Sequence, residues 1–128
     1  MSGPIRVALI EDNDVFREAL ELLLGLVPDV EFVGSEADGR DAAGLCGRLS
    51  PDVLLVDFRL PGPDGVEVTS AVRRACPGVA VVCLTAAAND REVEALSAAG
   101  AVECVMKNDS LEEIVDAVRR AAGREAPA

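Results

Sequence analysis

Groups capable of chemistry follow directly after four apolar runs of this chain. They are the carboxylates of Glu11 and Asp12, the carboxylate of Asp57, the hydroxyl of Thr85 and the ammonium of Lys107. The run before Asp57 is the clearest, because four aliphatic residues lead into it and a turn rich in Pro and Gly follows. We therefore take Asp57 as the centre of the candidate site.

These groups would form an aspartyl-phosphate site if they met at one sheet edge. Carboxyl ends of neighbouring parallel strands meet there, so Glu11, Asp12 and Asp57 would converge. Such a cluster of like charge is relieved by a shifted pKa or a divalent cation, and oxygen ligands suit Mg²⁺. Asp57 would be the nucleophile, while Thr85 and Lys107 would stabilise phosphoryl oxygens. Taken singly, an acidic residue is often a helix cap and a lysine is usually solvated, so the prediction depends on the whole set.

Apolar runs alternate with amphipathic segments along the chain. The runs lie at 5–10, 30–34, 53–57, 79–84 and 101–106. Short apolar runs bounded by turn residues are typical of strands buried on both faces of a parallel sheet. The segments between and after them predict helices within 13–28, 39–51, 64–75, 89–100 and 110–123. The alternation predicts an α/β domain with right-handed crossovers.

Local signals set the predicted helix ends. Asn89 with Glu92, and Ser110 with Glu113, have the spacing of a capping box, while Pro28 is expected to end the first helix. Helical periodicity predicts the buried stripes. For the first, third and fourth helices these are Phe16, Ala19, Leu20, Leu23, Leu24 and Val27; Val68, Ala71, Val72 and Ala75; and Val93, Leu96 and Ala99.

Composition excludes several classes of function. The 128 residues are half apolar and carry 12 basic against 23 acidic side chains, a net charge of −11. The basic residues are scattered, so we expect no direct contact with nucleic acid. No apolar run approaches the ~20 residues of a membrane span, and we expect a cytoplasmic protein without a membrane segment.

The cysteines do not form a metal or disulfide motif in the sequence. Cys46, Cys76, Cys83 and Cys104 lack C-x-x-C spacing, and the chain has no His to complete a zinc site. We expect reduced thiols that serve as small core residues.

The motifs together resemble the receiver domain of response regulators in two-component signalling, most closely the receivers of helix-turn-helix transcriptional regulators. The resemblance covers about 5–123 and depends on Glu11-Asp12, on Asp57 with the Phe-Arg-Leu-Pro-Gly-Pro-Asp-Gly that follows it, on Leu84-Thr85-Ala86 and on Lys107. It implies a flavodoxin-like fold with strand order 2-1-3-4-5 and helices on both faces. The receiver domain would span 1–123, with 124–128 as a tail or the start of a linker.

The resemblance also implies a role for each site residue. Asp57 would accept a phosphoryl group from a histidine kinase. Asp12, Asp57 and the backbone carbonyl of Arg59 would bind Mg²⁺, and Glu11 would hold a metal water. Thr85 and Lys107 would bind the phosphoryl oxygens and report the modification. The surface of the fourth helix, fifth strand and fifth helix would then control an output domain, a partner protein or a homodimer, with no chemistry beyond self-phosphorylation and self-dephosphorylation.

Two positions depart from the family pattern, and two others are expected to influence how long the phosphoryl group stays on Asp57. Cys104 replaces the usual switch aromatic, so we expect either switching through the loop after Thr85 and the fourth helix, or a small residue that fills a gap. Asn108 replaces a proline that commonly has a cis bond, and we predict a trans peptide. Arg59 and Ala87 flank the attacking water in this family and should influence the phosphoryl lifetime.

Other functions remain open at this point. A phosphohydrolase resembling the haloacid dehalogenase family would need a second carboxylate where Arg59 stands. A flavin carrier would need phosphate donors where the loop after 5–10 is acidic. A receiver that acts without phosphorylation, as a protein-interaction module, is the main alternative. Arg119 and Arg120 lie near Glu112, Glu113 and Asp116 and would form either a self-complementary ionic face or solvated pairs within the helix.

Overall fold

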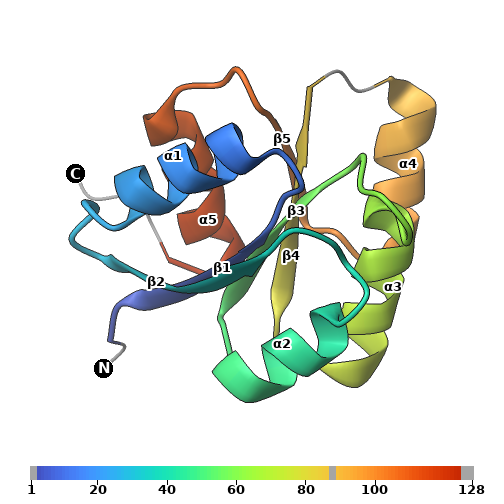
Figure 1. The fold of residues 1–128 in the computed structure, drawn as a ribbon, viewed down its shortest axis with the longest axis horizontal. Coiled ribbons are helices and arrows are strands. Elements are labelled where there is room, and N and C mark those ends of the chain that lie inside the picture. The colour runs from blue at the N-terminus through green and yellow to red at the C-terminus, as the bar shows by residue number, and fades with distance from the viewer. Residues whose placement is uncertain (1–2, 87–88, 125–128) are drawn as a thin grey trace.

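The computed structural model describes residues 3–86 and 89–124, which form one parallel sheet with helices on both faces (Figure 1). The strands are β1 (Ile5–Ile10), β2 (Val30–Glu36), β3 (Val53–Asp57), β4 (Ala80–Thr85) and β5 (Glu103–Met106), in the order β2-β1-β3-β4-β5. The helices are α1 (Asp14–Leu24), α2 (Ala42–Leu49), α3 (Gly65–Ala75), α4 (Asp90–Ala99) and α5 (Leu111–Ala121). In the part of the chain described, none of these helices has the length and apolar character needed to cross a bilayer. The predicted fold class and strand order are confirmed.

The central strands are apolar on both sides because helices cover both faces of the sheet. In β1, Val7 and Leu9 pack into a core with α1 and α5, whereas Ala8 and Ile10 pack into a second core with α2 and α3. Figure 1 shows the same two layers, with α4 on the side of α3. Two-sided burial is the reason that these strands appear in the sequence as unbroken apolar runs.

The carboxyl ends of β1 and β3 lie side by side. Ile10 of β1 is the register partner of Val56 of β3, so the residues that follow each strand emerge at one edge. The chain crosses from β1 to β2 on one side and from β3 to β4 on the other, which makes this pair of strands the topological switch point of the sheet. Ligands bind at that point in open α/β sheets.

Side-chain caps fix the starts of four helices. Asn13 accepts from the Phe16 N–H at 2.9 Å and begins α1. Ser110 with Glu113 forms the predicted capping box of α5, and Asp64 with Glu67 forms a second one on α3. Asn89 caps α4 through the Glu92 N–H, but its own side-chain amide, and not its backbone N–H, donates to the Glu92 carboxylate. The predicted box on α4 is therefore only half formed.

Some element ends and buried stripes differ from the prediction. Helix α1 ends at Leu24, before Pro28, because Leu26 and Val27 hydrogen-bond three residues back and tighten the chain out of α geometry. β2 extends to Glu36, and β5 begins only at Glu103. The buried stripes are narrower than predicted, since a smaller part of each helix circumference packs against the sheet. Exposed members of the predicted stripes are Ala19, Leu23, Ala75 and Val93.

Candidate functional site

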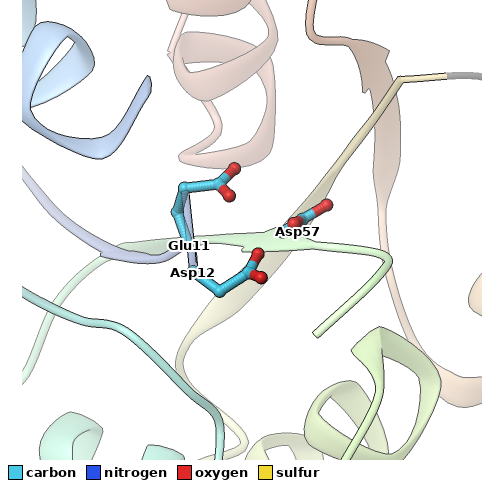
Figure 2. A group of neighbouring side chains, drawn as sticks. All are labelled: Glu11, Asp12 and Asp57. Carbon is cyan, nitrogen blue, oxygen red and sulfur yellow. The ribbon is translucent and has the colours of Figure 1, made fainter. Parts of the chain in front are cut away.

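Three carboxylates meet at the switch point. Glu11 and Asp12 follow β1 directly, and Asp57 is the last residue of β3. One oxygen from each side chain can be chosen so that all three lie within 4.8 Å of one another. Figure 2 shows the three side chains projecting from the two strand ends into the same space. Glu11 and Asp57 are buried, whereas Asp12 is exposed, so the cluster opens to solvent on the Asp12 side.

Asp57 is held in an environment that disfavours its charge. Its side chain is almost fully buried, and burial together with the negative charge of Glu11 raises the pKa of Asp57 from 3.8 to about 6. The Lys107 ammonium and the Arg59 N–H, which donates to Oδ1 at 3.2 Å, oppose this rise in pKa. The protein therefore supplies only part of the positive charge that an ionised Asp57 requires.

Lys107 lies between the two buried carboxylates. Its Nζ is 2.6 Å from Oε1 of Glu11 and 3.2 Å from Oδ2 of Asp57, and it lies 4.9 Å from the centroid of the Phe16 ring. Burial alone would lower the pKa of Lys107, but the hydrogen bond to Glu11 and the charges of both carboxylates outweigh it and raise this pKa. The lysine thus stays protonated and can serve either acid.

Glu11 is fixed more firmly than its neighbour Asp12. Its Oε2 accepts the Asn13 N–H at 2.9 Å, and its backbone carbonyl accepts from the Arg17 guanidinium at 2.8 Å. The Glu11 side chain is fully buried. Glu11 is therefore an anchored charge, while the exposed Asp12 has oxygens that face solvent.

The donor set fits a hard divalent cation. The site supplies carboxylate oxygens, and its one lysine is shared between two buried acids. On the loop after β3, the Arg59 N–H donates to Oδ1 of Asp57 at 3.2 Å. Such an oxygen-only set with an open side suits Mg²⁺, which keeps several waters. The three carboxylates Glu11, Asp12 and Asp57 thus lie close enough together to share one cation, and the predicted part of the Arg59 carbonyl stays a prediction.

Thr85 and Arg59 frame the mouth of the site. Thr85 ends β4 and is buried, and its carbonyl accepts the Lys107 N–H at 2.8 Å. Asp57 and Leu84 are register partners, so Asp57 and Thr85 emerge from adjacent strands. The Arg59 side chain is 71% exposed and reaches α4, where its Nη2 lies 3.7 Å from Oε1 of Glu92. Ala87, predicted to influence the phosphoryl lifetime, lies outside the described residues.

The two family departures near β5 are both visible in the structure. The peptide bond between Lys107 and Asn108 is trans, as predicted. Cys104 occupies the switch-aromatic position and lines a shallow cavity between β5 and α4, together with Val93, Leu96, Ser97, Ala101, Val102 and Glu103. Cys104 thus borders a cavity at the position where the family usually has an aromatic ring.

Three contacts of the site were missed in the sequence. Phe16 contacts the Lys107 ammonium, Arg17 holds the Glu11 carbonyl, and Glu92 binds Arg59. Phe16 and Arg17 lie in the first turn of α1, soon after Glu11 and Asp12. This closeness in sequence could have indicated that they contact the site. Glu92 carried no such signal, since it is far from Arg59 in the chain.

Comparison with known proteins agrees with the fold. A model of the family described as response regulator receiver domain matches residues 7–119. The transcriptional regulatory protein LiaR of Bacillus subtilis is 36% identical over 118 residues, which cover 92% of this chain and 56% of LiaR. The response regulator protein VraR of Staphylococcus aureus is 33% identical over 116 residues, covering 91% of this chain and 56% of VraR. The chain thus spans about half the length of these relatives.

Solved structures show the same architecture. The signal receiver domain of the putative response regulator NarL from Mycobacterium tuberculosis superposes with a TM-score of 0.90 at 34% identity, covering 95% of this chain and 98% of that one. A two-component response regulator of the LuxR family from Aurantimonas gives a TM-score of 0.88 at 28% identity, covering 98% of this chain and 90% of that one. The fold and site define a parallel α/β domain with an acidic cluster and a lysine at its switch point. This chain belongs to the response regulator receiver domain family of two-component signalling.

Proposed function

We propose that Asp57 accepts a phosphoryl group from a histidine kinase. The observation that carries this proposal is the position of Asp57 itself, at a strand end, nearly buried, beside a second buried carboxylate and 3.2 Å from the Lys107 ammonium. The negative charge of such a carboxylate is only partly compensated by the protein. With a bound metal cation beside it, the carboxylate is suited to attack phosphorus. An Asp57 oxygen would form the new P–O bond while the N–P bond of the kinase phosphohistidine breaks and the imidazole leaves.

The surrounding residues supply positioning and charge. Asp12, Asp57 and the Arg59 carbonyl would hold Mg²⁺, with Glu11 binding a metal water. The ion would neutralise charge on the phosphoryl oxygens. Lys107 would turn from its carboxylate partners to a phosphoryl oxygen, because that group carries more negative charge than the carboxylate it replaces. The Thr85 hydroxyl would donate to a second oxygen from the end of β4.

Switching would then pass through the loop after Thr85 and through α4. Support comes from the weak anchoring of α4, in which only Leu96 is buried, and from the Arg59–Glu92 ion pair, which ties α4 to the loop after Asp57. Cys104 leaves a cavity in place of an aromatic ring, so strand β5 need not move far. Comparison by NMR with and without a phosphoryl mimic tests this route, and a large rearrangement of β5 would contradict it.

The changed surface of α4, β5 and α5 would control an output domain, most simply one that regulates transcription, or a partner protein or second copy. The relatives are about twice as long as the matched region, which supports an output domain after 1–123, with 124–128 leading into it. Of this predicted tail, 125–128 lies outside the described residues. The net charge of −11 supports a receiver that does not itself contact nucleic acid.

Intact-mass spectrometry after incubation with acetyl phosphate and Mg²⁺ tests the proposal. We expect one phosphoryl adduct on the natural chain, and none on Asp57→Asn or after addition of a chelator. An adduct on Asp57→Asn would overturn the assignment of the phosphoacceptor. Absence of any adduct would favour the second candidate, a receiver that acts as a protein-interaction module without phosphorylation.

The phosphoryl lifetime tests the proposed role of Arg59. Arg59→Asn removes the contact with Glu92 and should change the dephosphorylation rate, while Arg91→Asn, an exposed arginine on α4, should not. An unchanged rate in Arg59→Asn would remove this side chain from the mechanism. We expect no turnover of other phosphate esters, which separates this function from that of a phosphohydrolase.

A further inference from the structure

Two cysteines that are far apart in the sequence become neighbours in the sheet. Cys83 of β4 and Cys104 of β5 are register partners in adjacent parallel strands, and both thiols are free. Register partners of neighbouring strands point to the same face and lie about 4.8 Å apart. This separation falls within the range of about 4.4–6.8 Å between Cα atoms that a disulfide bridges.

The two thiols differ in access. Cys83 is fully buried, whereas Cys104 is partly exposed and lines the cavity between β5 and α4. The walls of that cavity include Val93 and Leu96 of α4, so a small uncharged reagent can enter it. Such a reagent would meet Cys104 first.

The two thiols also differ in acidity. The Cys83 thiol donates to the Leu84 carbonyl at 3.6 Å. The neighbouring Cys83 thiol lowers the pKa of Cys104 to about 7, although burial and the charge of Glu92 act in the opposite direction. The neighbouring Cys104, burial and nearby negative charge raise the pKa of Cys83. Cys104 is therefore the member of the pair that ionises.

We propose that Cys104 and Cys83 form a peroxide-reactive dithiol, with Cys104 as the attacking thiolate and Cys83 as the resolving thiol. The Cys104 thiolate attacks one oxygen of hydrogen peroxide, the O–O bond breaks, and Cys104 becomes a sulfenic acid as hydroxide leaves. The Cys83 sulfur then attacks the Cys104 sulfur, the S–O bond breaks, and water leaves with the thiol proton. Overall, two thiols and one peroxide give a disulfide and two waters. This site goes beyond the phosphoacceptor function and does not rest on it.

The remaining cysteines provide an internal comparison. Cys46 is buried in α2, and burial raises its pKa to about 11. Cys76 at the end of α3 is partly exposed, and its thiol donates to the Ala43 carbonyl at 3.8 Å. Cys76 therefore controls for exposure, because it is similarly accessible but has no thiol donor assigned to it.

The order of alkylation tests the attacking role without any substitution. The reduced natural chain is treated briefly with iodoacetamide at pH 7 and mapped by peptide mass spectrometry. We expect Cys104 to react on the order of tenfold faster than Cys76, because the thiolate is the reactive form. Equal rates at these two positions, or a faster Cys76, would overturn the assignment of Cys104.

Peroxide treatment tests the resolving role. We expect the natural chain to lose the mass of two hydrogen atoms and to yield a peptide pair linked between Cys83 and Cys104. Cys83→Ser should stop at a Cys104 sulfenic acid that dimedone traps, Cys104→Ser should show neither product, and Cys76→Ser should behave like the natural chain. A sulfenic acid that persists on Cys104 in the natural chain, or a disulfide through Cys76, would overturn the dithiol. Circular dichroism of each variant verifies that the fold is retained.

Discussion

Lys107 lies closer to Glu11 than to the proposed phosphoacceptor. Its ammonium is 2.6 Å from Oε1 of Glu11 and 3.2 Å from Oδ2 of Asp57. Glu11 is fully buried and accepts the Asn13 N–H, so its carboxylate holds Lys107 at the site before any phosphoryl group arrives. The same lysine and the same glutamate act in opposite directions on the charge of Asp57.

Substitutions at Glu11 and Lys107 should shift the pKa of Asp57 in opposite directions. Glu11→Gln removes a negative charge that raises this pKa, so the pKa should fall below about 6. Lys107→Met removes a cation that lowers it, so the pKa should rise. NMR titration of the Asp57 carboxyl carbon without Mg²⁺ measures both effects, with the exposed Glu112→Gln as control. Shifts of the same sign in the two variants would contradict the described cluster.

Asp57 should make the fold less stable as pH rises through the acidic range. Its pKa is 3.8 in an ordinary setting and about 6 in the folded protein, so the folded state binds more protons between these values. Stability therefore falls as pH rises across this window. At pH 7 Asp57→Asn should be more stable than the natural chain by roughly 1–3 kcal/mol, because the variant carries no charge at this position.

Urea unfolding of both proteins at several pH values measures this difference. The advantage of Asp57→Asn should shrink toward zero near pH 3.8, where the folded natural chain is protonated at Asp57. Mg²⁺ at pH 7 should stabilise the natural chain more than the variant. An advantage of the variant that does not depend on pH would show that packing, and not ionisation, is its cause.

Two glycines should respond to alanine with opposite signs. A Cβ on Gly65 would lie 2.8 Å from the Phe58 Cα and 2.9 Å from the Asp57 carbonyl oxygen, so the backbone beside Asp57 must move. We expect Gly65→Ala to cost about 1–3 kcal/mol of unfolding free energy and to weaken Mg²⁺ binding. A Cβ on Gly47 of α2 meets nothing within 4 Å, and Gly47→Ala should add about 0.5–1 kcal/mol. Chemical denaturation measures both; a destabilised Gly47→Ala would show that general disturbance of the chain is the cause.

The ion pair between Asp29 and Arg119 should depend on pH in the opposite sense to Asp57. Arg119 donates from Nε and Nη2 to the two Asp29 oxygens, each at 2.8 Å, and this lowers the pKa of Asp29. The stabilisation is present above the ordinary pKa of 3.8 and is lost as pH falls through the lowered pKa. Asp29→Asn should cost about 0.5–1 kcal/mol at pH 7, since the pair is partly exposed.

Unfolding of Asp29→Asn at pH 7 and well below pH 3.8 tests this prediction. Glu112→Gln is the control, because Glu112 is exposed and lies on α5 with Arg119. A loss that persists at low pH would point to packing instead of the ion pair.

The ion pairs of α5 also give partners to its two arginines. Arg119 binds Asp29 and Asp116, and Arg120 binds Glu103, so both arginines have acidic partners within the chain.

The sequence carried enough to predict the fold and the members of the acidic cluster. Each site residue directly follows an apolar run, and strand ends of a parallel sheet share one edge, so Glu11, Asp12 and Asp57 had to converge once the strand order was inferred. The roles of Thr85 and Lys107 as phosphoryl ligands came from the chemistry of a hydroxyl and an ammonium at strand ends and from the resemblance, and they stay predictions.

The sequence could not predict features that depend on tertiary geometry. The preference of Lys107 for Glu11 depends on side-chain distances that no spacing encodes. The pairing of Cys83 with Cys104 requires the register of β4 on β5. The early end of α1 reflects a tightened last turn in place of the predicted stop at Pro28. Sequence periodicity predicted which face of each helix is buried but overestimated the width of the buried stripe. The width depends on how the helix packs on the sheet, which periodicity does not encode.

Helix α4 has one buried side chain, Leu96, whereas each of the other four helices has at least two. The free energy of local unfolding is lowest where few buried apolar side chains become exposed to water. The backbone amides of α4 should therefore exchange with deuterium sooner than those of α3 or α5, through a partial unfolding that leaves the sheet intact. The helix beside the proposed phosphoryl site should thus be the helix that opens most readily, and phosphorylation of Asp57 should shift the balance between its closed and opened forms.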